Sequence, residues 1–153
     1  MLYPPERDAL GKHDLSSIRM RWATPADAAV WERLRCELWP DGTQDHGPEI
    51  ALFFAGHPFR DLAAALVAED RSGAIVGFAE LSARDDVPGL EGTKTGYVEG
   101  LYVVPEARFR GVAWKLLQAS RNWAHEQGCV AFASDRAERI VVDRSFARIA
   151  GGK

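Results

Sequence analysis

The stretch that decides the fold is YVEGLYVVPEARFRGVAWKLL, residues 97–117. Its first half is an apolar run typical of a strand, and its second half opens a helix after Pro105. The predicted apolar face of that helix comprises Val112, Leu116, Ala119 and Trp123. A strand that turns into a helix aims unpaired backbone N–H groups at one point, with the positive end of the helix dipole behind them. This arrangement predicts a phosphate site.

Side chains around the predicted phosphate site have the properties that such a site needs. Gly111 permits an unusual backbone angle, Ala113 keeps the next turn small, and Arg108 and Arg110 add positive charge. A basic helix start whose glycine serves only packing would have the same R-x-x-G-x-A spacing. The spacing alone therefore leaves both interpretations open.

The segments on either side predict a mixed sheet with helices. Alternating or continuous apolar runs predict strands over residues 18–22, 64–70, 74–84, 96–104 and 129–134. The second and third of these flank a short turn and should pair antiparallel, whereas the last should be parallel to the strand before the 112–127 helix. Thr24 as N-cap and Pro25 at the first position predict a helix to about Trp39, with an apolar stripe of Val30, Leu34 and Leu38. A short helix is expected around Glu49 to Phe54.

Composition restricts the possible classes of protein. The 153 residues fit one domain, and we expect a flexible leader over residues 1–16 and a single domain over 17–153. A net charge of −3 argues against a nucleic-acid partner, and the sequence contains neither a membrane-spanning run nor a signal peptide, so we expect a cytoplasmic protein. We expect Cys36 and Cys129 to be buried, reduced thiols, and the four histidines lack the spacing of a metal site.

The quoted stretch resembles the acyl-coenzyme A motif of the GCN5-related N-acetyltransferase (GNAT) superfamily, R/Q-x-x-G-x-G/A, matched here by Arg108, Gly111 and Ala113. The resemblance implies an α/β (α+β) GNAT fold, a mixed central sheet flanked by helices, and acetyl-CoA as cosubstrate without a metal. It implies that the backbone of Leu101, Tyr102 and Val103 faces the thioester. It also implies that backbone amides of one continuous segment hold the pyrophosphate: Phe109, Arg110, Gly111, Val112, Ala113 and Trp114.

Four motifs in register resemble a narrower group, the aminoglycoside 6'-N-acetyltransferases. They are LRCELWPD (34–41), VEGLYVVP (98–105), RGVAWKLL (110–117) and FASD (132–135). The resemblance implies an antibiotic-resistance enzyme in which Trp39, Glu99 and Asp135 line the aminoglycoside site. It implies direct attack by the amine in a ternary complex, with Glu99 or Asp135 accepting a proton from that amine. No tyrosine follows Tyr102, so water or another group must protonate the leaving thiol.

Each of these three side chains also has a purely structural interpretation. Trp39 would close the core at the end of the first helix, Glu99 would be a solvated residue on an edge, and Asp135 would cap a following helix. Two functional alternatives also stay open. One is a GNAT enzyme for a polyamine or peptide amine, and the other is a truncated, non-catalytic CoA-binding remnant.

The family pattern breaks after Asp135. Ile140 stands about where relatives carry an asparagine that contacts coenzyme A, and the usual C-terminal strand pair is expected to be lacking. An amphipathic last helix is expected instead, with basic and apolar residues alternating: Arg136, Arg139, Ile140, Val141, Arg144, Phe146, Arg148 and Ile149, ended by Gly151 and Gly152. The sheet edge thereby left open predicts a homodimer; a leader that covers the edge, or a frame shift near residue 138, would explain the same pattern.

Overall fold

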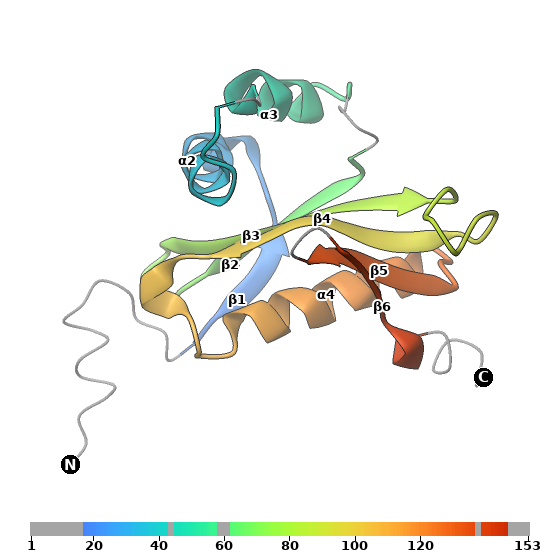
Figure 1. Cartoon of the computed structure of the whole chain (residues 1–153). Helices are drawn as coiled ribbons and strands as arrows, with labels where there is room; N and C mark the ends of the chain where they lie inside the picture. The colour runs from blue at the N-terminus through green and yellow to red at the C-terminus, as the bar shows by residue number, and fades with distance from the viewer. Residues whose placement is uncertain (1–16, 43–44, 58–61, 137–138, 147–153) are drawn as a thin grey trace, which may run out of the picture.

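The computed structural model describes residues 17–42, 45–57, 62–136 and 139–146. They form one sheet in the order β1-β2-β3-β4-β5-β6, with helices on both faces (Figure 1). The strands are β1 (Arg19–Trp22), β2 (Ala64–Glu69), β3 (Ile75–Arg84), β4 (Thr95–Val103), β5 (Ala131–Arg136) and β6 (Arg139–Val142). The helices are α2 (Ala28–Leu38), α3 (His46–Phe54) and α4 (Val112–Glu126), with short 3₁₀ turns η1 (Pro25–Asp27) and η2 (Pro105–Ala107).

Strand pairing confirms the predicted mixed sheet. Each strand pairs antiparallel with its neighbour in sequence, except that β4 and β5 run parallel and are joined through α4. Helices α2 and α3 lie on one face of the sheet and α4 on the other (Figure 1). On the α4 face, a Cβ on Gly96 would lie 2.5 Å from Cβ of Ala124, so only glycine at this position lets α4 pack so closely against β4.

The first helix differs from its prediction in its start and in its buried face. Pro25–Asp27 form a 3₁₀ turn before α2, and the Asp27 carboxylate accepts a 2.7 Å hydrogen bond from the Thr24 backbone N–H. The buried residues of α2 are Trp31, Leu34 and Arg35, whereas Val30 and Leu38 are only half-buried. All three predicted positions contact the core, because Val30 and Leu38 pack against it beside the buried Leu34. The prediction missed Trp31 and Arg35, since a buried arginine is invisible to a search for apolar periodicity.

The C-terminal segment contradicts the expected last helix over residues 139–142 and agrees with it over residues 144–146, which are helical. Residues 139–142 form β6, which pairs antiparallel with β5 and so satisfies backbone groups at the edge that the sequence left open. The sequence predicted that the usual C-terminal strand pair is missing, but the structure has one strand, β6, in this part of the chain. Phe146 is buried and stacks on His125 with ring centroids 4.0 Å apart. The expectations for residues 1–16 and for Arg148 to Gly152 lie outside the described residues.

Smaller expectations divide in the same way. Cys129 is buried as predicted, but the prediction for Cys36 was wrong, because this residue lies on the exposed side of α2. Within the described ranges, none of the helices combines the length and the apolarity that crossing a bilayer requires. Over the same residues, no group of three or more His, Cys, Asp or Glu side chains is arranged to hold a metal ion.

Candidate active site

A cleft of about 600 Å³ opens between the end of α2, the second half of β4 and the start of α4. Eight of the residues that the sequence assigned to the cofactor line it: Leu101, Tyr102, Val103, Arg108, Phe109, Gly111, Ala113 and Trp114. Glu37, Leu38 and Ala107 complete the lining. Val112 is buried in the core, so only its backbone remains available to a ligand, and Arg110 is an exposed residue of the same loop.

The start of α4 has the backbone geometry of an anion site. Gly111 has φ 85° and Phe109 has φ 64°, both in the left-handed region that non-glycine residues rarely adopt. The first intrahelical hydrogen bond of α4 joins Lys115 N–H to Gly111 C=O, so the three preceding N–H groups have no partner within the helix. A Cβ on Gly111 would meet nothing within 4 Å, which leaves open space above the turn. These features fit the pyrophosphate of coenzyme A.

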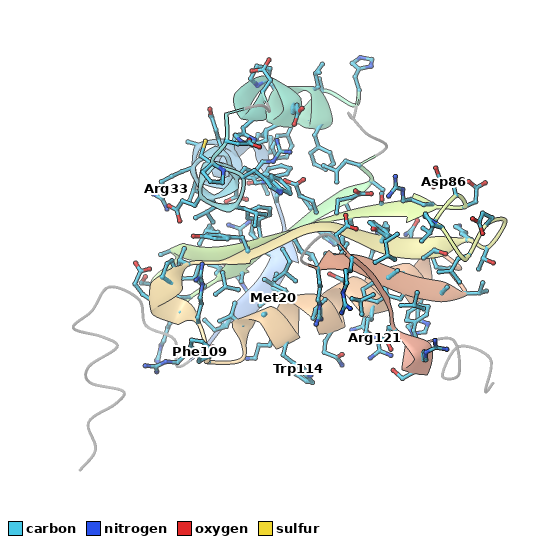
Figure 2. The ribbon with its side chains drawn as sticks, viewed as in Figure 1. Met20, Arg33, Asp86, Phe109, Trp114 and Arg121 are labelled. Atoms are coloured by element: carbon cyan, nitrogen blue, oxygen red, sulfur yellow. The ribbon has the colours of Figure 1, made fainter. Side chains whose placement is uncertain are left out.

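Exposed aromatic rings flank this turn. The Phe109 side chain is fully exposed and Trp114 is 63% exposed, and both project from the start of α4 (Figure 2). Arg108 instead has a defined position inside the cleft. Its Nε donates a 2.8 Å hydrogen bond to the Val103 carbonyl, and its guanidinium lies 5.4 Å from the centroid of the Tyr102 ring. Arg108 therefore shapes the cleft wall through the backbone of β4.

A β-bulge opens the sheet beside the cleft. Glu80 pairs with Gly100 but Leu81 pairs with Val98, so Glu99 is the extra residue of β4. The parallel pairing of β4 with β5 extends only from Thr95 to Val98. Past the bulge, the 101–103 segment of β4 has no β5 partner. This free edge provides backbone groups where an extended ligand arm can bind.

Both predicted carboxylates belong to one polar cluster at the bulge. Glu99 Oε2 accepts a 2.5 Å hydrogen bond from Ser82 Oγ and lies 3.6 Å from Arg84 Nη1. The Tyr97 hydroxyl donates to Asp135, and the Arg84 guanidinium lies 4.8 Å from the centroid of the Tyr97 ring. Burial and then the hydrogen bond to Asp135 raise the pKa of Tyr97 above its usual range. Tyr97 and Arg84 thus connect the two carboxylates.

Trp39 packs at the same bulge. A Cβ on Gly100 would lie 2.6 Å from Cη2 of Trp39, so the indole ring lies directly on the residue that follows Glu99. The ring is half-buried and stacks on His46 with centroids 6.3 Å apart. Trp39 therefore packs against the sheet, and the same packing places its ring beside the predicted acceptor site.

A buried charged network lies beneath Trp39. Arg35 Nε is 2.8 Å from Glu80 Oε2, Arg35 Nη1 donates to Glu49 at 2.9 Å, and Trp31 Nε1 donates to Glu80 at 2.8 Å. Burial raises the pKa of Glu80 to about 6, although the nearby Arg35 guanidinium acts in the opposite direction. The network ties α2 and α3 to β3 at the residue opposite Gly100.

Sequence reasoning missed several of these residues and misread others. Tyr97 lies two positions before Glu99, and the period of two in a strand would have placed both on one face. Arg84 and Arg35 gave no comparable signal. Asp135 belongs to β5, so the helix-capping interpretation was wrong. Glu99 is 21% exposed in its side chain and hydrogen-bonded, which contradicts the interpretation as a solvated edge residue.

The cleft and the cluster together suit acyl transfer to an amine. The cleft offers an anion site and a free strand edge, and the cluster at the bulge of the same strand offers carboxylates that attract a cationic amine and accept its proton. Amine and acyl group would meet at the bulge, where positioning alone accelerates such a reaction.

Known proteins are similar to this chain in sequence and in fold. Residues 27–146 match the acetyltransferase (GNAT) family. The aminoglycoside N(6')-acetyltransferase type 1 of Klebsiella aerogenes is 46% identical over 78% of this chain and 79% of its own length, and that of Stenotrophomonas maltophilia is 40% identical over 78% and 76%. The structure of AAC(6')-Iy in complex with the bisubstrate analogue CoA-S-monomethyl-acetylneamine superposes with a TM-score of 0.69, at 29% identity over 89% of this chain and 90% of that one. The chain therefore belongs to the GNAT family and, within it, to the aminoglycoside N(6')-acetyltransferases.

Proposed function

We propose that this protein transfers the acetyl group of acetyl-CoA to the 6'-amine of an aminoglycoside, by direct attack of the amine in a ternary complex, and thereby confers resistance. The observation that carries the proposal is that two parts of a site adjoin at the bulge of β4: the cleft, which we call the coenzyme half, and the carboxylate cluster, which we call the acceptor half. A cleft of about 600 Å³ with an anion-binding helix start reaches Leu101, two residues beyond the bulge residue Glu99. The relatives named above carry this activity in their names.

The coenzyme half rests on backbone groups. Acetyl-CoA supplies the activated thioester that the amine attacks. The N–H groups of Val112, Ala113 and Trp114 would hold its pyrophosphate, and the free edge of β4 at Leu101–Val103 would hold the extended arm. Since neither contact needs a side chain of special chemistry, this half does not depend on Ile140, which lies in β6 and pairs with Asp135.

The acceptor half rests on charge. An aminoglycoside is a polycation whose reacting amine must lose a proton before it attacks. Glu99 and Asp135 lie in one cluster, so they attract the polycation together and either can accept the proton, directly or through water. Trp39 on Gly100 offers an indole face next to these carboxylates. Direct transfer needs no enzyme nucleophile, so neither cysteine has a part in the mechanism.

The test is release of free coenzyme A thiol from acetyl-CoA by the purified full-length chain, with kanamycin, tobramycin or spermine as acceptor. Turnover with the drugs and not with spermine is the expected result. Turnover with spermine alone would replace the proposal by a polyamine acetyltransferase. Heat stabilisation by coenzyme A without any turnover would replace it by a binding remnant.

We propose in addition that the protein is a homodimer. Strand β6 is the last strand of the described sheet, and its Ile140 and Val142 are 39% and 37% exposed. An edge with exposed apolar side chains favours pairing with a second copy. Sedimentation of a monomer at micromolar concentration would refute the dimer.

We also propose a cytoplasmic location, since acetyl-CoA is made and consumed inside the cell. Fractionation of expressing cells tests it, with a co-expressed cytoplasmic marker enzyme as reference. Recovery with the membrane or periplasmic fraction would refute it.

A further inference from the structure

One cation lies inside the acidic cluster of the acceptor half. The Arg84 guanidinium is 3.6 Å from Glu99 Oε2 and 3.5 Å from Asp86 Oδ1, and it covers the Tyr97 ring whose hydroxyl is bonded to Asp135. Arg84 is the last residue of β3, and Asp86 lies in the loop that follows it (Figure 2). The groups that face this guanidinium are therefore Glu99, Asp86 and Tyr97, two of which are carboxylates.

The ion pairs of Arg84 are loose and reachable from solvent. The side chain of Arg84 is 37% exposed, that of Glu99 21% and that of Asp86 72%, and both separations exceed the usual length of a charged hydrogen bond. Solvent-exposed pairs of this kind contribute little to stability, because water and salt replace them easily. Arg84 can therefore exchange its carboxylate partners at little cost to the fold.

We propose that Arg84 is a specificity-determining residue. In the free protein its guanidinium occupies the place beside Glu99 where one ammonium group of the acceptor binds, so a polycationic acceptor must displace it. The inference rests on the proposed function and goes further, because it names a residue that weakens acceptor binding. An ammonium group and the guanidinium seek the same oxygen of Glu99. Each acceptor must break the Arg84 pair before it forms its own, and the guanidinium also repels every further ammonium group, so Arg84 weakens the binding of a polyamine more than that of a monoamine.

The test compares steady-state KM for two acceptors in three variants. Neamine carries several ammonium groups, and 6-amino-6-deoxyglucose carries one. In Arg84→Gln, KM for neamine should fall about fivefold at low ionic strength, since an exposed ion pair is worth at most about that factor. KM for the monoamine should change much less. Arg84→Lys keeps the cation and should keep the wild-type KM. Arg71→Gln removes the same charge from an exposed position in the turn before β3 and should leave both KM values unchanged.

A neamine KM that stays the same or rises in Arg84→Gln would overturn the inference while leaving the proposed function intact. If that variant turns over too slowly for kinetics, calorimetric titration of neamine into its coenzyme A complex gives the affinity directly, and an affinity no tighter than wild type is again a refutation. If neither wild type nor Arg71→Gln acetylates any aminoglycoside, the proposed function fails and the inference fails with it.

Discussion

Two arginine–carboxylate clusters lie next to each other on the α2–α3 face of the sheet, and they differ mainly in burial. In the inner cluster, Arg35 and Glu80 are 1% and 2% exposed in their side chains and 2.8 Å apart. In the outer cluster, Arg84 and Glu99 are 37% and 21% exposed and 3.6 Å apart. Glu80 pairs with Gly100 and Glu99 is the bulge residue before it, so a single bulge separates the two clusters.

The difference in burial gives the two clusters different tasks. A buried ion pair that loses one partner leaves an uncompensated charge in a low-dielectric interior, so the inner cluster cannot exchange partners. An exposed pair loses little when a ligand replaces one member. The inner cluster fixes α2, and with it Trp39, against the bulge. The outer cluster can then exchange its cation for an acceptor amine at a position that the inner cluster keeps rigid.

Removing Arg35, the cation of the inner cluster, should produce the largest effect, a loss of folding stability. Arg35→Met keeps length and apolar volume but leaves Glu80 buried with the Trp31 N–H as its remaining partner. We expect a loss of about 3 kcal/mol in the free energy of unfolding at pH 8. The loss should be smaller at pH 5, where Glu80 is protonated, since burial raises its pKa to about 6.

Urea unfolding at both pH values measures this effect. Arg33→Met removes an exposed arginine of the same helix and should cost less than about 0.5 kcal/mol. Equal stability of the two variants at pH 8 would show that the inner cluster does not fix α2 and would remove the contrast between the clusters.

Removing either outer carboxylate should affect turnover rather than folding. We expect Glu99→Gln and Asp135→Asn each to lower kcat/KM for an aminoglycoside by about 100-fold, the usual size of a general-base contribution, with coenzyme A affinity unchanged. The measurement is steady-state kinetics together with thermal stabilisation by coenzyme A. Asp85→Asn removes an exposed carboxylate from the β3–β4 loop and is the matched control. Wild-type kinetics in both variants would exclude these carboxylates from the site.

The same contrast in burial explains what the sequence could predict. The strand–turn–helix of 97–117, the hairpin of β2 and β3, and the α4 crossover were all predicted, because each depends on local apolar periodicity and turn residues. The unusual backbone angle at Gly111, in the turn that we propose binds phosphate, was expected for a similar reason, since glycine adopts such angles readily. A helix was expected where β6 stands, because four residues carry too little pattern to separate a strand from a helix when the edge of β5 decides the outcome.

The charged clusters were the part that local pattern could not reveal. Arg35 contacts Glu80 and Glu49 across 45 and 14 positions of sequence (80 − 35 and 49 − 35), and Arg84 meets Glu99 only because β3 and β4 pair with a bulge between them. Such contacts depend on how the helices pack on the sheet or on the register of two strands, and no single segment of sequence specifies either. Glu99 and Asp135 were proposed as site residues from motif resemblance, while Tyr97, which contacts Asp135, was not.

The inner carboxylate should also make stability depend on pH. The folded pKa of Glu80 is raised from 4.5 to about 6, so the folded state binds this proton more tightly than the unfolded state. Glu80 therefore adds about 2 kcal/mol to the free energy of unfolding. This stabilisation is fully present below pH 4.5 and is lost as pH rises through 6. Asp27 acts in the opposite direction and in a lower window, because the Arg21 hydrogen bond lowers its pKa and its contribution is lost as pH falls.

Subtracting the stability of Glu80→Gln from that of wild type isolates this contribution. The difference in urea midpoint should fall between pH 4.5 and pH 7, and other titrating groups cancel in the subtraction. If the difference in urea midpoint stays constant over that interval, Arg35 compensates the Glu80 charge completely. Protonation of Glu80 would then have no effect on stability.

A smaller effect is expected outside both clusters, and it separates the coenzyme half from the acceptor half. Gly111→Val places a β-branched residue at φ 85°, which costs about 1–2 kcal/mol of backbone strain, although the Cβ meets no neighbour within 4 Å. If the turn must keep this conformation to present its N–H groups, coenzyme A should bind about tenfold more weakly, while KM for the aminoglycoside at saturating acetyl-CoA stays unchanged. Gly56→Val is the matched control, with φ 86° and equally open surroundings at the end of α3. Gly56→Val should lose similar stability and keep its coenzyme A affinity. If both variants lose the same affinity, backbone strain alone explains the loss, and the turn at Gly111 has no special part in binding coenzyme A.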